Sequence, residues 1–516
     1  MINDQSGTAA PRPYTPPTLA QLGRVHFIGM GGAGMSAIAR IMLGQGVPVS
    51  GSDARASAGL AELGALGAVV HLGHEGANVA AVDTIVVSTA IRADNPELVA
   101  ARSAGLRILH RSQALAAAMA EDRVVAVAGT HGKTTTTSMI TVMLRGAGVD
   151  ASFAVGGTVQ ALGVNAAHGT ADVFVAEADE SDASFLNYSP RIAVVTNLEA
   201  DHLDHYGTAE AVFAAFESFT ALLPADGVLV ACADDPGSAR LAVLAAAAGT
   251  RTVTYGFADG ADIHIVAGTG TGLDTDTTLA IPGVLLGPGA ADTAVPLHLQ
   301  VPGAHNIRNA AAAVAVALEL GVDVHRATEA LATFNGAARR FELKGEGRGV
   351  RVFDDYAHHP TEVTAALKAA RTVAGGHKVH VLFQPHLFSR TREFAAEFAR
   401  ALDLADTVAV LDIYPAREDP IPGVSSTLIT DALSVPIGYA PEPAAAMAAL
   451  VGAAQSGDII LTVGAGDVTA HGPALVAALN AAPGNQAAAN PVPGNQARNT
   501  PGTGANGGTP SGGTRG

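Results

Sequence analysis

The chain has 516 residues, and its 30 Lys and Arg against 47 Asp and Glu give a formal net charge of −17. At roughly 150 residues per domain this length predicts about three domains, and the acidic balance argues against a general binder of nucleic acids or anionic membranes. Hydrophobic residues make up 48% of the chain, but no charge-free run of about 18 apolar residues occurs, which excludes an integral membrane protein; the single cysteine, Cys232, excludes internal disulfides and sites with several cysteine ligands.

Both ends of the chain are predicted to lie outside the fold. Residues 1–20 are rich in Pro and Thr, and residues 481–516 form a low-complexity tail of Pro, Gly, Asn and Gln. The N-terminal stretch lacks the basic and apolar regions of a signal peptide, so a cytoplasmic location is expected.

Between the ends, short β-branched runs alternate with Ala-rich helical stretches, a pattern typical of parallel sheets covered by helices. We therefore expect an α/β fold with three domains, bounded at 21–120, 121–337 and 338–480, each with a mostly parallel sheet. The predicted strands are Val25–Gly29, Thr84–Ser88, Val124–Ala128, Val173–Ala176, Ala193–Thr196, Gly227–Ala231, Val350–Phe353, Val379–Phe383, Val408–Leu411 and Ile459–Val463. A helix is expected at Ala37–Leu43, and residues 260–300 are expected to be a β-rich elaboration.

The first predicted strand runs into a glycine turn. Gly29, Gly31 and Gly34 form G-x-G-x-x-G, the fingerprint of a dinucleotide-type phosphate turn, and Asp53 stands about 20 residues further on, as a NAD site would require. The turn indicates a diphosphate site in a Rossmann-like domain, which leaves NAD and a nucleotide-sugar diphosphate as competing ligands. An NAD-dependent oxidoreductase therefore remains an alternative.

A second glycine turn follows Val124–Ala128 and reads Gly-Thr-His-Gly-Lys-Thr. Its glycines let backbone N–H groups approach phosphate oxygens, Lys133 adds a positive charge, and the hydroxyl of Thr134 can ligate Mg²⁺. Only two residues separate Gly129 from Gly132, so the turn is shorter than the standard G-x-x-x-x-G-K-[ST]. The pattern predicts a nucleoside-triphosphate site in a central domain like those of P-loop ATPases.

Two polar clusters follow the next strands of the central domain. Carboxylates and imidazoles at the carboxyl ends of parallel strands lie where an α/β sheet opens its ligand crevice, so these residues are candidate metal ligands beside the phosphates. The clusters are Glu177, Asp179, Glu180 and Asp182, and Asn197, Glu199, Asp201, His202, Asp204 and His205.

The last block, expected to be Rossmann-like, carries Asp-Asp-Tyr-Ala-His-His-Pro from Asp354 and Gln-Pro-His-Leu-Phe-Ser-Arg-Thr-Arg from Gln384. Two interpretations are open for these polar groups. His358, His359 and His386 supply three possible zinc ligands. Alternatively, Arg390 or Arg392 binds the carboxylate of a small substrate, with Tyr356 or a histidine near its amine.

Taken together, the motifs resemble those of the Mur ligases, nearest to the branch that adds L-alanine in peptidoglycan biosynthesis. The resemblance extends over about residues 22–475. Its segments are Gly29–Ser36, Ser50–Asp53, Gly129–Thr137, Ala176–Phe185, Thr196–Tyr206, Gly303–Ala313, Arg339–Phe341, Asp354–Pro360 and Phe383–Arg392.

The resemblance implies a cytoplasmic ligase that uses ATP to join L-alanine to the lactyl carboxylate of UDP-N-acetylmuramate. The carboxylate is activated as an acyl phosphate with Mg²⁺, or Mn²⁺ in its place, and the products are UDP-MurNAc-L-Ala, ADP and phosphate. No nucleic acid or membrane insertion is implied, and both a monomer and a homodimer are compatible with the sequence. The nearest alternative is the murein-recycling ligase that attaches a preformed tripeptide to the same nucleotide sugar.

Carried over residue by residue, the resemblance assigns catalysis to Lys133, Glu177 and His202, and the metal to Thr134, Glu177 and His202. The implied ATP site contains Gly129, Thr130, His131, Gly132, Lys133, Thr134, Thr135, Asn306, Asn309, Arg340 and Asp354, with Asp354 at the ribose. The implied UDP-MurNAc site contains Gly31, Gly32, Gly34, Met35, Ser36, Asp53, Ser88, Thr89 and Arg111. The implied L-alanine site contains Tyr356, His358, His386 and Arg390.

Two departures from the family pattern stand out. Sister ligases use a carbamoylated lysine after the Asp-His segment, but residues 206–220 contain no lysine, so the second metal must be held differently, as in the alanine-adding branch. Many alanine-adding members read Pro-His-Arg where this chain has Leu387, which leaves Arg390 or Arg392 to bind the alanine carboxylate. Because an acyl phosphate must be kept from water, we also expect the last domain to close over the central one, with hinges near 121 and 338.

Overall fold

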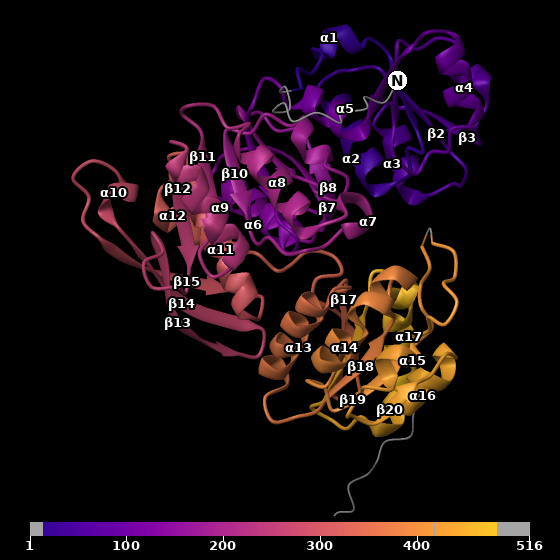
Figure 1. Ribbon diagram of the computed structural model, residues 1–516, viewed down its shortest axis with the longest axis vertical. Coiled ribbons are helices and arrows are strands. Elements are labelled where there is room, and N and C mark those ends of the chain that lie inside the picture. The colour runs from indigo at the N-terminus through magenta and orange to yellow at the C-terminus, as the bar shows by residue number, and fades with distance from the viewer. Residues whose placement is uncertain (1–13, 417, 482–516) are drawn as a thin grey trace, which may run out of the picture.

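The computed structural model describes residues 14–416 and 418–481 (Figure 1). The predicted tail lies outside these residues except for Ala481, which is helical, and most of the segment 1–20 lies outside them too; from Leu19 the chain already forms helix α1 (Leu19–Leu22). Three separate sheets organise the described chain, so the expected α/β fold of three domains is confirmed. The exact limits of those domains stay a prediction. No helix in the described part of the chain is long and apolar enough to cross a membrane.

The first unit is a five-stranded parallel sheet. Its strands, in spatial order, are β3 (Val69–Leu72), β2 (Val49–Asp53), β1 (Val25–Ile28), β4 (Thr84–Val87) and β5 (Arg107–His110). Its helices, besides α1, are α2 (Ala33–Gly44), α3 (Ala58–Ala65), α4 (Pro96–Ser103) and α5 (Arg111–Ala118). The order reverses at β1, so the glycine turn after β1 opens at the point where a doubly wound sheet binds ligands.

The middle unit contains a ten-stranded mixed sheet. Its strands, in spatial order, are β15 (Thr293–Leu299), β14 (Asp274–Ile281), β13 (Ile263–Thr271), β12 (Arg251–Gly256), β11 (Val228–Cys232), β10 (Ile192–Val195), β6 (Arg123–Ala128), β9 (Val173–Glu177), β7 (Ser152–Val159) and β8 (Val164–Ala167). Its helices are α6 (Lys133–Gly146), α7 (Leu203–Tyr206), α8 (Ala209–Thr220), α9 (Pro236–Ala247), α10 (Gly283–Leu286), α11 (Ala304–Glu319) and α12 (Val324–Leu331). Strands β13 to β15 pair antiparallel, which confirms the predicted β-rich elaboration.

Strand β6 shows why the central strands are easy to recognise. Its sequence Arg-Val-Val-Ala-Val-Ala is apolar on both faces because helices cover both sides of the sheet. Val125 and Val127 pack with helices α6 and α11, while Val124 and Ala126 belong to a core shared with α8, α9 and helices α2 and α5 of the first unit. The first and middle units therefore share one continuous apolar core.

The third unit is a six-stranded sheet, parallel except for its edge strand β16. Its strands, in spatial order, are β16 (Glu342–Gly347), β17 (Val350–Asp355), β21 (Ile459–Val463), β18 (Val379–Phe383), β19 (Thr407–Val410) and β20 (Ile437–Tyr439). Its helices are α13 (Pro360–Ala374), α14 (Phe388–Leu402), α15 (Thr427–Thr430), α16 (Pro443–Ala453) and α17 (His471–Ala481). Helices α13 and α14 pack on one face and α16 and α17 on the other, and Thr361 at the start of α13 contacts Glu199 of the middle unit.

Candidate functional site

The turn between β6 and α6 has the conformation of a phosphate loop. Gly129 and Gly132 adopt φ values of +136° and +81°, which L side chains rarely adopt. A Cβ atom on Gly129 would overlap the hydroxyl of Thr196, so only glycine fits. Helix α6 begins at Lys133 immediately after the turn, and its first N–H groups and positive dipole end face the loop.

The Lys133 side chain is half-buried in this loop. It donates to the carbonyls of Gly129 (2.7 Å) and Thr130 (3.2 Å) and to Glu180 Oε1 at 2.8 Å. Burial alone would lower the pKa of Lys133, but Glu180 and neighbouring carboxylates raise it above its usual range. The lysine is therefore cationic, as a phosphate ligand must be.

The three residues assigned to a metal lie around this lysine. The Thr134 hydroxyl donates to Glu177 Oε1 at 3.1 Å, and the Gly156 N–H donates to Glu177 Oε2 at 2.7 Å. His202 Nε2 lies 3.6 Å from Glu180 Oε1. Burial raises the pKa of Glu177, and Lys133 and the Gly156 N–H oppose the rise.

This donor set fits Mg²⁺. Thr134 and Glu177 supply hard oxygen donors, and the other carboxylate oxygen of Glu180, Oε2, is buried without a hydrogen-bond partner. A buried carboxylate oxygen without a partner is costly unless a cation or proton is supplied. Glu180, which the sequence placed only in a general acidic cluster, thus belongs to the centre of the site.

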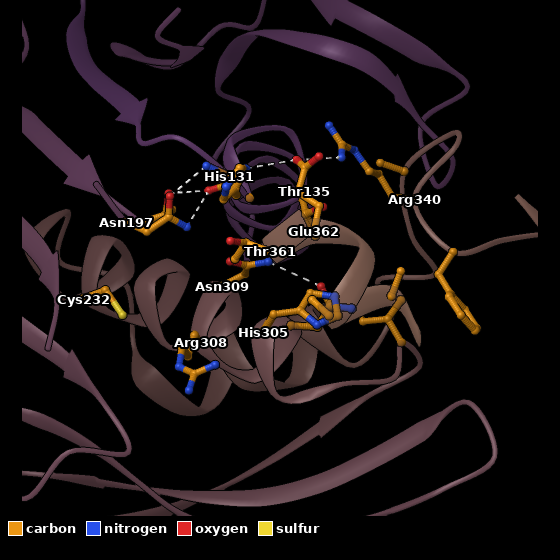
Figure 2. Close-up of a pocket in the computed structure, with 18 of the residues that line it drawn as sticks. His131, Thr135, Asn197, Cys232, His305, Arg308, Asn309, Arg340, Thr361 and Glu362 are labelled. Carbon is orange, nitrogen blue, oxygen red and sulfur yellow. Dashed lines mark hydrogen bonds and ion pairs between the residues drawn. The ribbon is translucent and has the colours of Figure 1, made fainter. Parts of the chain in front are cut away.

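A cavity of about 340 Å³ lies beside the phosphate loop, between the middle unit and the start of α13 (Figure 2). Figure 2 shows His131 and Thr135 from the loop region together with Asn309, Arg340 and Glu362 around it. The expected ATP residues that line it are His131, Gly132, Thr135, Asn306, Asn309 and Arg340. Asn306 donates to the Pro302 carbonyl at 2.8 Å and accepts from Asn309 at 3.4 Å, so the two amides form one fixed polar patch on α11.

Asp354, expected at the ribose, does not line this cavity. Its oxygens accept from the hydroxyls of Thr462 (2.6 Å) and Thr469 (2.7 Å) in the interior of the third unit. Successive residues of a strand point to opposite faces, and the next residue, Asp355, is the one that lines the cavity. Burial raises the pKa of Asp355 to about 6, although Arg340 opposes the rise. The side chain from this strand that reaches the cavity is thus one position beyond the one expected from the sequence.

The glycine turn of the first unit is closed by Asp53. The Gly31 N–H donates to Asp53 Oδ2 at 2.9 Å, and a Cβ atom at Gly31 would lie 2.8 Å from the same oxygen. Asp53 therefore caps a loop N–H group. The other residues expected at this site lie nearby. Ser88 and Thr89 follow the end of β4 at the same edge of the sheet. Met35 is buried, and the Ser36 hydroxyl donates to the Ala33 carbonyl at 3.1 Å.

Arg111 links this turn to the phosphate loop. Its guanidinium lies 3.3 Å from where a Cβ atom on Gly34 would stand, and it donates to Asp179 Oδ2 at 2.6 Å. Asp179 belongs to the acidic segment after β9, and Arg111, with Lys133, holds the pKa of Asp179 well below its usual range despite burial. The Arg111–Asp179 ion pair thus links the glycine turn of the first unit to the acidic segment beside the phosphate loop of the middle unit.

The residues expected to bind the amino acid gather on the facing side of the third unit. The His358 ring lies 5.3 Å from Tyr356 and 5.9 Å from His386, measured between centroids. Arg390 is buried, and it donates to both carboxylate oxygens of Asp201 in the middle unit, at 3.0 and 3.2 Å. Burial lowers the pKa of His358 to about 4, so its imidazole is neutral.

The trio His358, His359 and His386 does not form the zinc site considered from the sequence. The His359 ring faces His131 at 4.8 Å and Phe394 at 4.9 Å, away from the other two. Within the described residues, the single His, Cys, Asp and Glu group with metal-like spacing is instead His131, Glu199 and His359. Leu387, at the position that departs from the family pattern, has φ +70° and donates its N–H to the Tyr414 carbonyl at 3.0 Å.

The middle and third units meet through Glu362, which no sequence pattern singled out. Its carboxylate lies 3.3 Å from His131 Nδ1 and 3.8 Å from Arg340. Burial would lower the pKa of His131, but Glu362 and Glu199 raise it to about 9. Thr361 adds a 2.8 Å hydrogen bond from its hydroxyl to Glu199. Such contacts depend on docking between units, and the only sequence signal is an acidic residue in the first turn of a helix.

Comparisons with known proteins agree with this arrangement. Three family models match consecutive parts of the chain: the Mur ligase family catalytic domain at residues 24–123, the Mur ligase middle domain at 127–317, and the Mur ligase glutamate ligase domain at 339–466. The UDP-N-acetylmuramate–L-alanine ligase of Renibacterium salmoninarum is 66% identical over 461 residues, which cover 89% of this chain and 97% of that protein. The corresponding ligase of Kineococcus radiotolerans is 55% identical over 467 residues, with 89% and 97% covered.

Two solved structures have the same fold. The UDP-N-acetylmuramate-alanine ligase of Thermotoga maritima superposes with a TM-score of 0.72 at 29% identity, covering 88% of this chain and 98% of that one. A murein peptide ligase of Psychrobacter arcticus gives a TM-score of 0.63 at 25% identity, covering 90% and 100%. The family models and the close relatives together decide the assignment: the chain belongs to the Mur ligase family.

Proposed function

We propose that the chain is an ATP-dependent ligase that joins L-alanine to the lactyl carboxylate of UDP-N-acetylmuramate, releasing ADP and phosphate. The observation that carries this proposal is the convergence of three units on one place. One cation from each unit pairs with a carboxylate of the middle unit. Lys133 of the phosphate loop pairs with Glu180, Arg111 of the first unit with Asp179, and Arg390 of the third unit with Asp201. The 66% identity to an enzyme named for this reaction supports the same substrates.

ATP would occupy the cavity beside α6. Its base would contact the amides of Asn306 and Asn309, its ribose Asp355, and its phosphates the loop N–H groups, Lys133 and Arg340. Lys133 would exchange its contact with Glu180 for phosphate oxygens. Thr134, Glu177 and His202 would hold Mg²⁺, or Mn²⁺ in its place. When bound, the ion would offset the repulsion between the γ-phosphate and the attacking carboxylate.

UDP-N-acetylmuramate would bind across the glycine turn of the first unit. The N–H groups from Gly31 to Gly34 and the Arg111 guanidinium would face its diphosphate, and Ser88 and Thr89 lie at the same sheet edge. A carboxylate oxygen of the sugar's lactyl group then attacks the γ-phosphorus, the bond to ADP breaks, and an acyl phosphate forms.

L-Alanine would bind on the third unit. Arg390 would take its carboxylate, and the neutral His358, with Tyr356 and His386 beside it, would lie at its amino group, which reacts as the free amine. The amine then attacks the acyl carbon, and phosphate leaves with the proton that the nitrogen gives up. The cross-unit contacts of Glu362 with His131 and of Arg390 with Asp201 keep water away from the acyl phosphate, and hinges near 121 and 338 would open the site for release. All three substrates are cytoplasmic metabolites, so we place the reaction in the cytoplasm.

The test is phosphate release by the purified protein with ATP, Mg²⁺ and UDP-N-acetylmuramate, using L-alanine, glycine, L-serine and the L-Ala-D-Glu-diaminopimelate tripeptide as separate acceptors. Turnover that needs both the nucleotide sugar and L-alanine is expected. Turnover with the tripeptide alone would instead indicate a recycling ligase, as the similarity to the murein peptide ligase would then suggest. Binding of NADH without ATP turnover would favour an oxidoreductase.

A further inference from the structure

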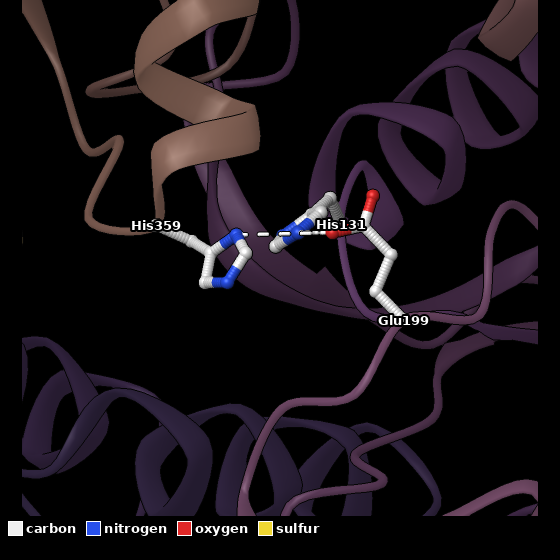
Figure 3. Close-up of side chains that lie close together, drawn as sticks. All are labelled: His131, Glu199 and His359. Carbon is white, nitrogen blue, oxygen red and sulfur yellow. Dashed lines mark ion pairs between the residues drawn. The ribbon is translucent and has the colours of Figure 1, made fainter. Parts of the chain in front are cut away.

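The group formed by His131, Glu199 and His359 lies outside the oxygen-rich centre around Thr134 and Glu177. Figure 3 shows the two imidazoles and the carboxylate turned toward one another, with one nitrogen from each ring facing Glu199. One ligand atom from each residue lies within 4.8 Å of the other two, and the two histidines are buried. His131 and Glu199 belong to the middle unit and His359 to the third, so the group spans the junction between them.

The hydrogen bonds around the group define which atoms face its centre. Glu362 Oε1 lies 3.3 Å from His131 Nδ1, which leaves Nε2 turned toward Glu199 Oε2 at 3.5 Å and without a hydrogen bond. His359 Nδ1 accepts the Thr361 N–H at 3.4 Å, a hydrogen bond that a metal at this nitrogen would displace, and it lies 3.9 Å from the same Glu199 oxygen. The His131 imidazolium supplies the positive charge beside Glu199, and a divalent cation held by Glu199 and the two rings would take its place, with release of the His131 Nε2 proton.

We propose that His131, Glu199 and His359 bind a Zn²⁺ ion that links the phosphate loop to the third unit. Two imidazoles and one carboxylate form the donor set of many zinc sites, whereas Mg²⁺ prefers oxygen ligands alone. In a tetrahedral zinc site with bonds of about 2.1 Å, ligand atoms stand about 3.4 Å apart. The 3.5 Å pair already has that spacing, and the 3.9 Å pair needs to close by about half an ångström.

The surrounding residues add the outer contacts that zinc sites use. Metal-binding histidines usually donate their other ring N–H to a carboxylate, and Glu362 is in that position for His131. The Thr361 hydroxyl donates to Glu199 Oε2 at 2.8 Å and so orients the carboxylate. The fourth position would open toward the nucleotide cavity, which His131, Glu199, Thr361 and Glu362 also line.

The proposal concerns binding by the ligand-free protein, so its test needs no turnover. The full-length protein, stripped of metal, is titrated with Zn²⁺ in competition with a chromophoric chelator. We expect one tight equivalent, a loss of at least about tenfold in affinity for His359→Gln and for Glu199→Gln, and a smaller loss for Glu362→Gln. His377→Gln is the matched control, because His377 is an exposed histidine of the same unit and should leave the affinity unchanged.

A second measurement reports the link between units. Zn²⁺ should raise the unfolding temperature of the wild-type protein and of His377→Gln, but not that of His359→Gln. Absence of a tight equivalent, or equal affinity in the wild type and both ligand variants, would overturn the site. A loss in His359→Gln without one in Glu199→Gln would overturn it as well, because the metal would then sit on other histidines.

Discussion

The ammonium of Lys133 donates a 2.8 Å hydrogen bond to Glu180 in the buried centre of the middle unit. The Glu180 carboxylate holds the ammonium at the place where phosphate oxygens of ATP would contact it. The lysine is thus held in the loop before nucleotide binds, and ATP exchanges one anion for another rather than ordering a free side chain.

Replacing Lys133 tests this arrangement. Lys133→Met is expected to lower kcat for ATP-dependent phosphate release by at least about 100-fold, because it removes a charge aimed at the transferred phosphoryl group. Circular dichroism of the variant should match the wild type. Lys368→Met, at an exposed position on α13, should keep full activity; near-normal turnover in Lys133→Met would contradict the role.

Thr134 should set the requirement for divalent metal. Thr134→Val removes the hydroxyl that meets Glu177 at 3.1 Å, so the Mg²⁺ concentration for half-maximal turnover should rise about tenfold. Thr136→Val is the matched control, because the Thr136 hydroxyl is buried without a hydrogen-bond partner and its loss should cost nothing. The measurement is an activity titration with Mg²⁺ and, in parallel, with Mn²⁺. Equal curves for the two variants would remove Thr134 from the metal site.

Asp354 and Asp355 should separate stability from nucleotide binding. Asp354→Asn disturbs two buried threonine hydrogen bonds and should cost about 1–3 kcal/mol of unfolding free energy with little change in the KM for ATP. Asp355→Asn should raise the KM for ATP several-fold. Chemical unfolding and initial rates measured on both proteins distinguish the roles, and the opposite pattern would restore Asp354 as the ribose ligand.

Arg390 should act on the amino acid rather than on ATP. Arg390→Lys keeps the charge but loses the planar guanidinium, whose Nη2 meets both oxygens of Asp201, so the KM for L-alanine should rise by about tenfold or more while the KM for ATP changes little. Arg400→Lys, an exposed arginine later in α14, serves as the control. Equal rises in both KM values would mean that Arg390 serves only to dock the units.

The first unit should show an acid-sensitive stability that depends on Glu97. Burial alone would raise the pKa of Glu97, but hydrogen bonds with Ser52, Asn78 and His74 and the nearby His26 ring lower it to about 2. A carboxyl group whose pKa is lower in the folded state than in the unfolded chain stabilises the fold at any pH above the unfolded pKa, here near 4.5. For Glu97 this contribution is up to about 3 kcal/mol, and it is lost as the pH falls from 4.5 toward 2.

Glu97→Gln removes the titrating group. The variant should be less stable than the wild type at pH 7, and its melting temperature should decline less steeply between pH 5 and pH 3. Thermal unfolding followed by circular dichroism across this range measures both effects. Parallel declines would show that the acid loss arises elsewhere.

The sequence patterns predicted the strands whose two faces are covered, because burial on both sides demands a continuous apolar run, as in β6 and β18. They missed β2, which reads Val-Ser-Gly-Ser-Asp, and β7, which contains two glycines, since small residues give no apolar period. Tertiary pairing decides these strands.

The same limit applies to the site. The phosphate loop could be recognised because its glycines serve local backbone geometry, which nearby residues encode. The choice between Asp354 and Asp355 depends on which face of β17 meets the cavity. The contact of Glu362 with His131 joins residues more than 200 positions apart, and only the docked units bring them together.

The most direct test of the central claim uses UDP-N-acetylmuramate labelled with ¹⁸O in its lactyl carboxylate. With ATP, Mg²⁺ and L-alanine, mass spectrometry should find UDP-MurNAc-L-Ala and, for each molecule formed, one phosphate that carries one ¹⁸O atom, because a carboxylate oxygen leaves with the phosphoryl group. Product without label in the phosphate would contradict the acyl-phosphate route, and the absence of the alanine adduct would contradict the proposed reaction itself.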